Sequence, residues 1–212
     1  MTDTEKREPK FSRLDADARR LSLMEATLHC LSTLGQRATS VRAICAQAGV
    51  SPGLLRHYFD GKEDLVASAY EYLTKKLYDS FHDLIGNDEL DAEQVLKDSF
   101  EILLNSEWVS KEMLGAWVAF WSIQQTDERM QKQHHEANHE VRKIFAQLLT
   151  NYATFKNLNV NDQDIKFATI ELMGLTDGLW LELCLDSDFY NGEQAVTICM
   201  NWLNSFKERF SH

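Results

Sequence analysis

Two helical patterns in the second half of the chain bring tryptophan side chains together with a carboxylate. Trp117 and Trp121 are four residues apart with Phe120 beside them, and Asp177 precedes Trp180 by three residues. Residues at these spacings share a helix face. Indole rings and a carboxylate suit a cation that cannot donate hydrogen bonds, since a quaternary ammonium over a Trp face gains ~0.5–2 kcal/mol. The same residues also fit a plain helical core, helix packing or a subunit interface.

A second candidate for chemistry is the stretch His135-Glu136-Ala137-Asn138-His139, which matches the H-E-x-x-H motif of zinc proteases. In that motif two histidines one turn apart bind the metal and the glutamate activates water. Glu171 is a candidate third ligand. The flanking side chains are polar, however, whereas a catalytic zinc site is apolar around its ligands. We therefore interpret the match as a solvated helix face, and a zinc-dependent hydrolase remains the alternative.

The third candidate is a pair of short helical segments joined by a glycine turn. Residues 40–48 and 51–59 are separated by Gly49-Val50, which is the layout of a helix-turn-helix. Ser40 and Ser51 are suitable N-caps, Pro52 suits the first helical position, and Gly49 can adopt the positive φ of the turn. The predicted shared core consists of Val41, Ile44, Val50, Leu54 and Phe59.

Charge divides the chain at about the same place. The net charge is −11, yet residues 1–62 contain ten Lys and Arg against seven Asp and Glu, so the excess of acid lies in residues 63–212. A basic head suits DNA, and an acidic body favours a cationic ligand. We therefore expect a DNA-binding domain in residues 1–62, with a linking helix to about residue 85, and a ligand-binding and dimerisation domain in residues 63–212.

The elements that must position these residues are helices. Apolar residues recur at spacings of three and four, and no stretch alternates as an exposed strand does, so the predicted fold class is all-α. Gly35 should end the first helix and Gly86-Asn87-Asp88 the fourth. The predicted helices cover residues 15–34, 40–48, 51–59, 62–85, 92–105, 109–125, 127–155, 164–185 and 192–210.

Composition and motifs limit the other function classes. The chain has no phosphate-binding loop, no G-x-S-x-G elbow and no nucleotide-binding fingerprint, so we predict neither an enzyme nor a cofactor. It has no apolar run near ~20 residues and no signal peptide, so we expect a cytoplasmic protein without a membrane partner. The cysteines are expected to be reduced and buried, with a redox sensor at Cys184 as the alternative; they are Cys30, Cys45, Cys184 and Cys199.

The stretch Ser40 to Leu65 resembles the N-terminal signature of TetR-family transcriptional regulators in its Ala-Gly-Val-Ser turn, in Gly53, in the aromatic cluster ending the second segment and in Lys62-Glu63. The resemblance implies that residues 51–58 lie in the major groove of operator DNA while other residues hold phosphates. Many relatives carry an aromatic residue where Arg56 stands, and we interpret Arg56 as reading a guanine edge. The implied DNA-binding residues are Ser40, Arg42, Ser51, Pro52, Gly53, Leu55, Arg56, His57, Tyr58 and Lys62.

The second half is similar to a narrower group, the BetI-like repressors that respond to choline, through residues 116–121 (AWVAFW) and 174–185 (GLTDGLWLELCL). This similarity implies a homodimer paired through the last two helices and released from DNA by a small-molecule inducer, choline or another quaternary ammonium. A regulator with an unrelated ligand and a helical docking protein that does not bind DNA remain alternatives. The implied ligand-binding residues are Trp117, Phe120, Trp121, Asp177 and Trp180.

Overall fold

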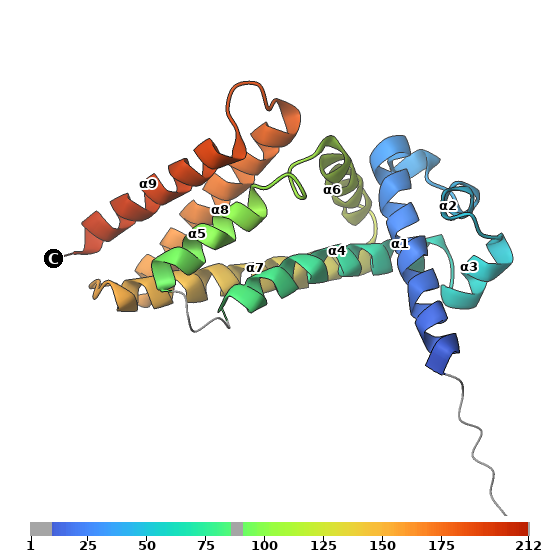
Figure 1. Ribbon diagram of the computed structural model, residues 1–212, viewed down its shortest axis with the longest axis horizontal. Coiled ribbons are helices and arrows are strands. Elements are labelled where there is room, and N and C mark those ends of the chain that lie inside the picture. The colour runs from blue at the N-terminus through green and yellow to red at the C-terminus, as the bar shows by residue number, and fades with distance from the viewer. Residues whose placement is uncertain (1–9, 86–90, 212) are drawn as a thin grey trace, which may run out of the picture.

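The computed structural model describes residues 10–85 and 91–211 of the chain. These residues form nine α-helices and no strand, which confirms the all-α fold class. A small head of α1 to α3 lies at one end of an elongated body, and α4 runs from the head along the body (Figure 1). The helices are α1 (Lys10–Ala38), α2 (Val41–Ala48), α3 (Pro52–Tyr58), α4 (Lys62–Ile85), α5 (Ala92–Leu103), α6 (Lys111–Gln124), α7 (Glu128–Phe155), α8 (Asp162–Leu185) and α9 (Gly192–Phe210).

The helix boundaries follow the sequence pattern closely. Helices α4 and α9 begin and end at the predicted residues. Helix α1 begins at Lys10 and continues past its predicted end, but Gly35 interrupts it with a φ of 72° and a ψ of 172°. A kink therefore stands where a helix end was predicted. The predicted break at Gly86-Asn87-Asp88 lies outside the described residues.

Local hydrogen bonds build the helix-turn-helix of the head as the sequence predicts. The side chains of Ser40 and Ser51 each accept a hydrogen bond at 3.2 Å, from the backbone N–H groups of Ala43 and Leu54. Gly49 ends α2 in the left-handed region with a φ of 65°. These caps satisfy backbone donors that a helix start leaves free. They fix the angle at which α3 leaves the turn.

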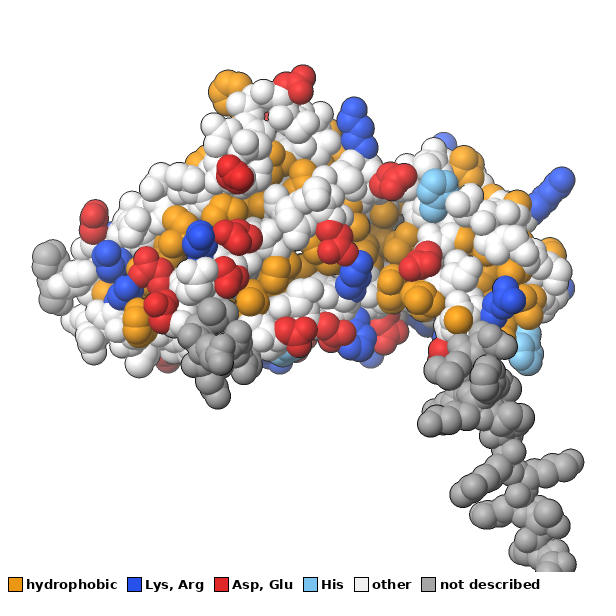
Figure 2. Space-filling view, in the orientation of Figure 1, with side chains coloured by type: hydrophobic (Ala, Val, Ile, Leu, Met, Phe, Trp, Pro, Cys, Tyr) orange, Lys and Arg blue, Asp and Glu red, His pale blue; other side chains and the backbone are white. Residues whose placement is uncertain are grey.

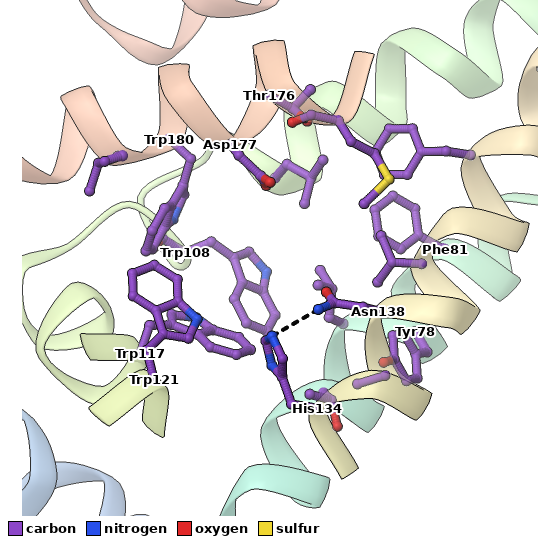
Figure 3. Close-up of a pocket in the computed structure, with 18 of the residues that line it drawn as sticks. Tyr78, Phe81, Trp108, Trp117, Trp121, His134, Asn138, Thr176, Asp177 and Trp180 are labelled. Carbon is purple, nitrogen blue, oxygen red and sulfur yellow. Dashed lines mark hydrogen bonds between the residues drawn. The ribbon is translucent and has the colours of Figure 1, made fainter. Parts of the chain in front are cut away.

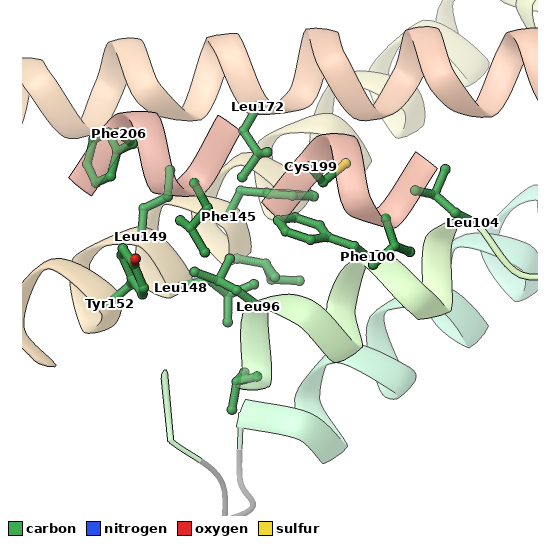
Figure 4. Close-up of a cluster of buried hydrophobic side chains, with 14 of the residues drawn as sticks. Leu96, Phe100, Leu104, Phe145, Leu148, Leu149, Tyr152, Leu172, Cys199 and Phe206 are labelled. Atoms are coloured by element: carbon green, nitrogen blue, oxygen red, sulfur yellow. The ribbon is translucent and has the colours of Figure 1, made fainter. Parts of the chain in front are cut away.

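The core of the body lies where α5, α7, α8 and α9 meet (Figure 4). Phe100 from α5, Phe145 from α7 and Phe206 from α9 are fully or almost fully buried there, together with Leu172 from α8. We call this group, which also includes Phe81 from α4, the body core. Burial of such side chains contributes ~1.5–3 kcal/mol each. The body core holds the four helices as one unit.

A second buried group joins the head to the body, and we call it the inner cluster. It contains Leu31 from α1, Tyr70 and Leu73 from α4, Trp108 from the segment before α6, and Phe120 from α6. Helix α6 also packs across α1. A motion of α4 or α6 must therefore displace the head.

The cysteines are free and buried, as predicted. Burial raises the pKa of each thiol, and that of Cys199 to about 12, so the reactive thiolate is disfavoured at all four positions. None of the helices in residues 10–85 and 91–211 combines the length and the apolar character that crossing a membrane requires.

Candidate functional site

Helix α3 presents a polar face at the outer end of the head. Ser51, Pro52, Gly53, Arg56 and His57 are exposed there, and Tyr58 is half-buried. In Figure 2 basic side chains stand at the outer end of the head, and acidic side chains are spread over the body among some basic ones. The exposed face therefore combines hydrogen-bonding groups with positive charge, which suits phosphates and base edges.

One residue predicted to contact DNA is buried instead. The side chain of Leu55 has an exposed fraction of 0% and belongs to the core of the head, while Leu54, which was predicted for that core, is half-buried. Neighbours on a helix point about 100° apart, because a turn takes ~3.6 residues. The prediction was wrong by one position, and the Leu55 side chain holds α3 in place rather than facing the groove.

The remaining predicted DNA contacts lie at the starts of α2 and α4. Ser40 and Arg42 are exposed at the start of α2, and the Lys62 ammonium donates a hydrogen bond to the Gln36 carbonyl oxygen at 3.5 Å. Sequence reasoning missed Arg20 on α1. Its guanidinium donates to the Tyr58 carbonyl oxygen at 2.8 Å and lies 4.5 Å from the centre of the Phe59 ring, so it fixes the end of α3.

The body contains a cavity of about 430 Å³ between the body core and the inner cluster (Figure 3). This volume is in the range of ligand-binding pockets, ~300–1,000 Å³. Most of its wall is apolar or aromatic, with a few polar groups. The residues that line the cavity include Tyr70, Phe81, Trp108, Trp117, Trp121, His134, Asn138, Val141, Phe145, Met173, Asp177 and Trp180.

Indole rings form one wall of the cavity. The ring centres of Trp117 and Trp121 on α6 are 6.4 Å apart, and the Trp180 ring on α8 meets Trp121 edge to face at 6.5 Å. The Trp180 indole N–H donates to the carbonyl oxygen of Trp108 at 2.9 Å. This bond fixes the orientation of Trp180, so three predicted ligand residues and the unpredicted Trp108 are brought together.

Phe120 was predicted to bind the ligand but lies behind this wall. Its side chain has an exposed fraction of 1% and does not line the cavity. Its ring centre is 5.1 Å from that of Tyr70 and 6.1 Å from that of Trp117. Phe120 therefore supports Trp117 from the inner cluster, because position 120 of α6 faces the head and α4 rather than the cavity.

Asp177 supplies a carboxylate to the same wall, and Figure 3 shows its side chain pointing into the cavity beside Trp180. Within the described part of the chain it has no hydrogen-bond or ion-pair partner. The surrounding protein desolvates the carboxylate and raises its pKa. A cation placed against Asp177 would restore the lost solvation of the charge.

A hydrogen-bonded histidine stands across the cavity. The Asn138 amide nitrogen lies 2.8 Å from His134 Nε2, and the Tyr70 hydroxyl lies 3.0 Å from His134 Nδ1. If the amide donates to Nε2, Nδ1 carries the proton and donates to the Tyr70 oxygen. Desolvation, followed by the charges of Arg142 and His135, lowers the pKa of His134. These surroundings favour the neutral imidazole, which connects α7 to α4.

The H-E-x-x-H residues do not form part of this site. His135, Glu136 and His139 are exposed on α7, and Glu136 lies 3.8 Å from Lys132. Glu171, the third ligand that the zinc alternative would require, accepts a hydrogen bond from Arg209 on α9 at 2.9 Å. Residues 10–85 and 91–211 hold no group of three His, Cys, Asp or Glu side chains placed to share a metal ion.

Comparison with known proteins assigns both parts of the chain to families. Residues 23–69 match the family described as bacterial regulatory proteins, tetR family, and residues 92–207 match the family described as BetI-type transcriptional repressor, C-terminal. The chain is 27% identical over 186 residues to the HTH-type transcriptional regulator BetI of Yersinia pestis (strain Pestoides F). The aligned residues cover 87% of this chain and 90% of that protein.

Solved structures share the whole architecture. A candidate transcriptional regulator from Pseudomonas aeruginosa PAO1 is 35% identical with a TM-score of 0.83, covering 95% of this chain and 98% of that one. A candidate transcriptional regulator from Saccharomonospora viridis, in complex with choline, is 18% identical with a TM-score of 0.73, covering 91% and 96%. The second likeness concerns the fold alone.

Proposed function

Because this chain belongs to the tetR family of bacterial regulatory proteins and carries a BetI-type repressor domain, we propose that it binds operator DNA as a dimer and is released by a small quaternary ammonium ligand. In this proposal residues 1–62 are the DNA-binding domain, and residues 63–212 bind the ligand and the second subunit. Choline is the first ligand to test.

We infer the class of the ligand from the carboxylate of Asp177, which has no partner within the described residues and lies in a wall of indole rings. An unpaired carboxylate away from bulk water is unfavourable, whereas a cation over aromatic faces is favourable by ~0.5 kcal/mol when exposed and ~2 kcal/mol when desolvated. A quaternary ammonium satisfies both groups without needing hydrogen-bond acceptors. The choline bound to the Saccharomonospora viridis regulator, which has the same fold, supports this choice.

The exposed face of α3 supports operator binding. Arg56 and His57 stand at the outer end of the head, on a helix whose start is fixed by the Ser51 cap. An arginine can pair with a guanine edge through two hydrogen bonds, which discriminates between bases by ~1–3 kcal/mol. Ser40, Arg42 and Lys62 flank the face where phosphates would lie, and these contacts would position the head.

The proposed dimer pairs through α8 and α9. Helix α8 carries a stripe on which Phe167, Ile170, Leu181 and Leu185 are exposed. Positions 174 and 178 complete its spacing of three or four residues, and Leu181 also borders the cavity. Gly174 and Gly178 lie on the same stripe, and a Cβ at either would meet no atom of another helix within 4 Å. A second copy of the stripe can approach closely at these glycines and bury the apolar side chains.

Release of DNA requires that the ligand change the position of the head. The cavity wall includes Tyr70 from α4 and Trp117 from α6, and both belong to or pack against the inner cluster that joins head and body. A ligand that displaces these side chains would alter the spacing of the two α3 helices, which must fit half-sites ~34–36 Å apart.

Choline titration by calorimetry tests the ligand class, with the neutral carbon isostere of choline as a second ligand. We expect choline to bind and the isostere to bind far more weakly, because the isostere lacks the charge. Asp177→Asn should weaken choline ~10- to 100-fold, a change of roughly 1.4–2.8 kcal/mol. Glu182→Gln, which removes an exposed carboxylate of α8, is the matched control. Equal binding of the two ligands would contradict the proposal.

A further inference from the structure

We infer that the cavity contains a second, apolar subsite that accepts a chain of several carbons attached to the cation, so that the best ligand is an amphiphilic quaternary ammonium rather than choline itself. This inference rests on the proposed function, because it takes the cation site at Asp177 as given. It adds the size and the shape of the ligand.

The size of the cavity is the first argument. Its volume of about 430 Å³ has room for roughly fourteen non-hydrogen atoms at the ~30 Å³ that a water molecule occupies in the liquid. Choline contains about half as many. A ligand no larger than choline would leave the remaining wall in contact with water, which is unfavourable where that wall is apolar.

The distribution of side chains around the cavity is the second argument. Asp177 and Trp180 lie on one side of the space in Figure 3, and Phe81 lies on the other. Phe81 from α4 and Phe145 from α7 belong to the body core, and Val141 and Met173 pack against it beside them. All four side chains are uncharged, and we call the part of the wall that they form the apolar end.

The charges around the cavity indicate that the hydrocarbon chain of the ligand is itself uncharged. The described residues that line the cavity include the carboxylate of Asp177 but no Lys or Arg, and the imidazole of His134 is held neutral by its surroundings. A carboxylate or phosphate on the ligand would therefore be buried without a partner, at a large cost. The polar lining groups nearest Phe81 in Figure 3 are uncharged: Asn138, whose amide nitrogen donates to His134, and Tyr78. An uncharged hydrocarbon chain fits this surface.

The apolar end also adjoins the helix that carries the head. Phe81 lies on α4, eleven residues after Tyr70 on the same helix. A chain in the apolar subsite would therefore contact α4 directly, while the ammonium group contacts α6 and α8 through Trp121 and Trp180. A longer ligand therefore adds contacts with α4, one of the helices that reach the head.

Affinity across a series of trimethylammonium ions tests the inference, with tetramethylammonium and its butyl, hexyl and octyl homologues below their micelle concentrations. With the full-length protein we expect the dissociation constant to fall about three- to fourfold per added methylene until the cavity is full. Burial of one methylene group is favourable by ~0.8 kcal/mol, which corresponds to this factor. A hexyl homologue that binds within about twofold of tetramethylammonium would overturn the inference and leave the cation site intact.

One variant distinguishes binding of the alkyl chain in the subsite from its non-specific adsorption elsewhere on the protein. Val141→Phe places a ring in the apolar end and should abolish the gain with chain length while tetramethylammonium keeps its affinity. An unchanged gain in this variant would show that the chain binds elsewhere. If no ion of the series binds the unmodified protein, both the proposed ligand class and this inference are wrong.

Discussion

The backbone oxygen of Ser32 on α1 lies 2.7 Å from the position that a Cβ would occupy at Gly115 on α6. Real Cβ atoms do not approach other atoms so closely, so only glycine lets the two helices pack in this way. Two residues further along α6, Trp117 lines the cavity. Head and cavity therefore share one helix, at a point where even a methyl group would force them apart.

Substitution of Gly115 tests this contact. Gly115→Ala should push α1 away from α6 and destabilise the fold by ~1–3 kcal/mol, the usual effect of overpacking. Because the head moves while the cavity remains, we expect DNA affinity to fall more than affinity for the cation. Thermal unfolding and the two dissociation constants are the measurements. Ser122→Ala is the control, since it removes only the hydrogen bond that Ser122 donates to Gln36 across the same pair of helices at 2.9 Å.

The neutral state of His134 predicts a dependence of stability on pH. Its pKa is lower in the folded protein than its ordinary value of ~6.5, so the unfolded chain takes up a proton first as the pH falls. The neutral His134 therefore contributes its full stabilisation above about pH 6.5, and this stabilisation is lost as the pH falls through the lowered pKa of the folded protein. His134→Gln should flatten the fall of the unfolding temperature between about pH 7 and 5. His135→Gln, on the exposed side of α7, is the matched control, and an equal effect of both variants would contradict the prediction.

We predict that Arg56 recognises a guanine at one base pair of the operator. If its guanidinium pairs with a guanine, Arg56→Ala should reduce discrimination at a single base pair by ~1–3 kcal/mol and leave the other positions unchanged. Binding to a library of operator variants measures the profile. Lys62→Ala should instead weaken binding to all sequences and reduce its dependence on salt, as the loss of a phosphate contact does. A specificity profile that Arg56→Ala does not alter would show that this side chain reads no base.

The apolar stripe on α8 predicts how the proposed dimer would be disrupted. Phe167→Asp places a charge on the stripe and should convert the dimer to monomers in sedimentation, with operator affinity reduced at least tenfold because the two heads no longer bind together. Phe189→Asp is the matched control. Phe189 has an exposed fraction of 89% but lies in the turn after α8, outside the stripe. A Phe167→Asp protein that remains dimeric would place the interface elsewhere.

Much of the fold can be predicted from the sequence because local signals agree with one another. Ser40, Gly49 and Ser51 each act on their own few residues, and the structure shows all three in the predicted conformations. The long helices follow from apolar residues at spacings of three and four. Boundaries differ mainly where a helix continues beyond its apolar stripe, as α1 does on both sides of its predicted range.

The parts of the site that were missed depend on tertiary packing. Trp108 lies in an irregular segment, where no periodicity predicts the direction of a side chain. Phe120 and Leu55 lie on predicted helices, but the sequence leaves open which of two apolar neighbours faces the core. His134 and Asn138 lie within or beside the H-E-x-x-H match on a polar helix, and only contact with Tyr70 on another helix makes them part of the cavity. Such pairings between distant segments have no local signal.

The most direct test of the account is fluorescence anisotropy of a labelled duplex from the DNA upstream of the gene, titrated with the protein at fixed salt with and without millimolar choline. We predict specific binding that choline weakens about 5- to 150-fold, a coupling of ~1–3 kcal/mol. The Asp177→Asn protein should bind the same duplex but no longer respond to choline. Specific binding that choline leaves unchanged, or an Asp177→Asn protein that choline releases as readily as the unmodified one, would contradict the account.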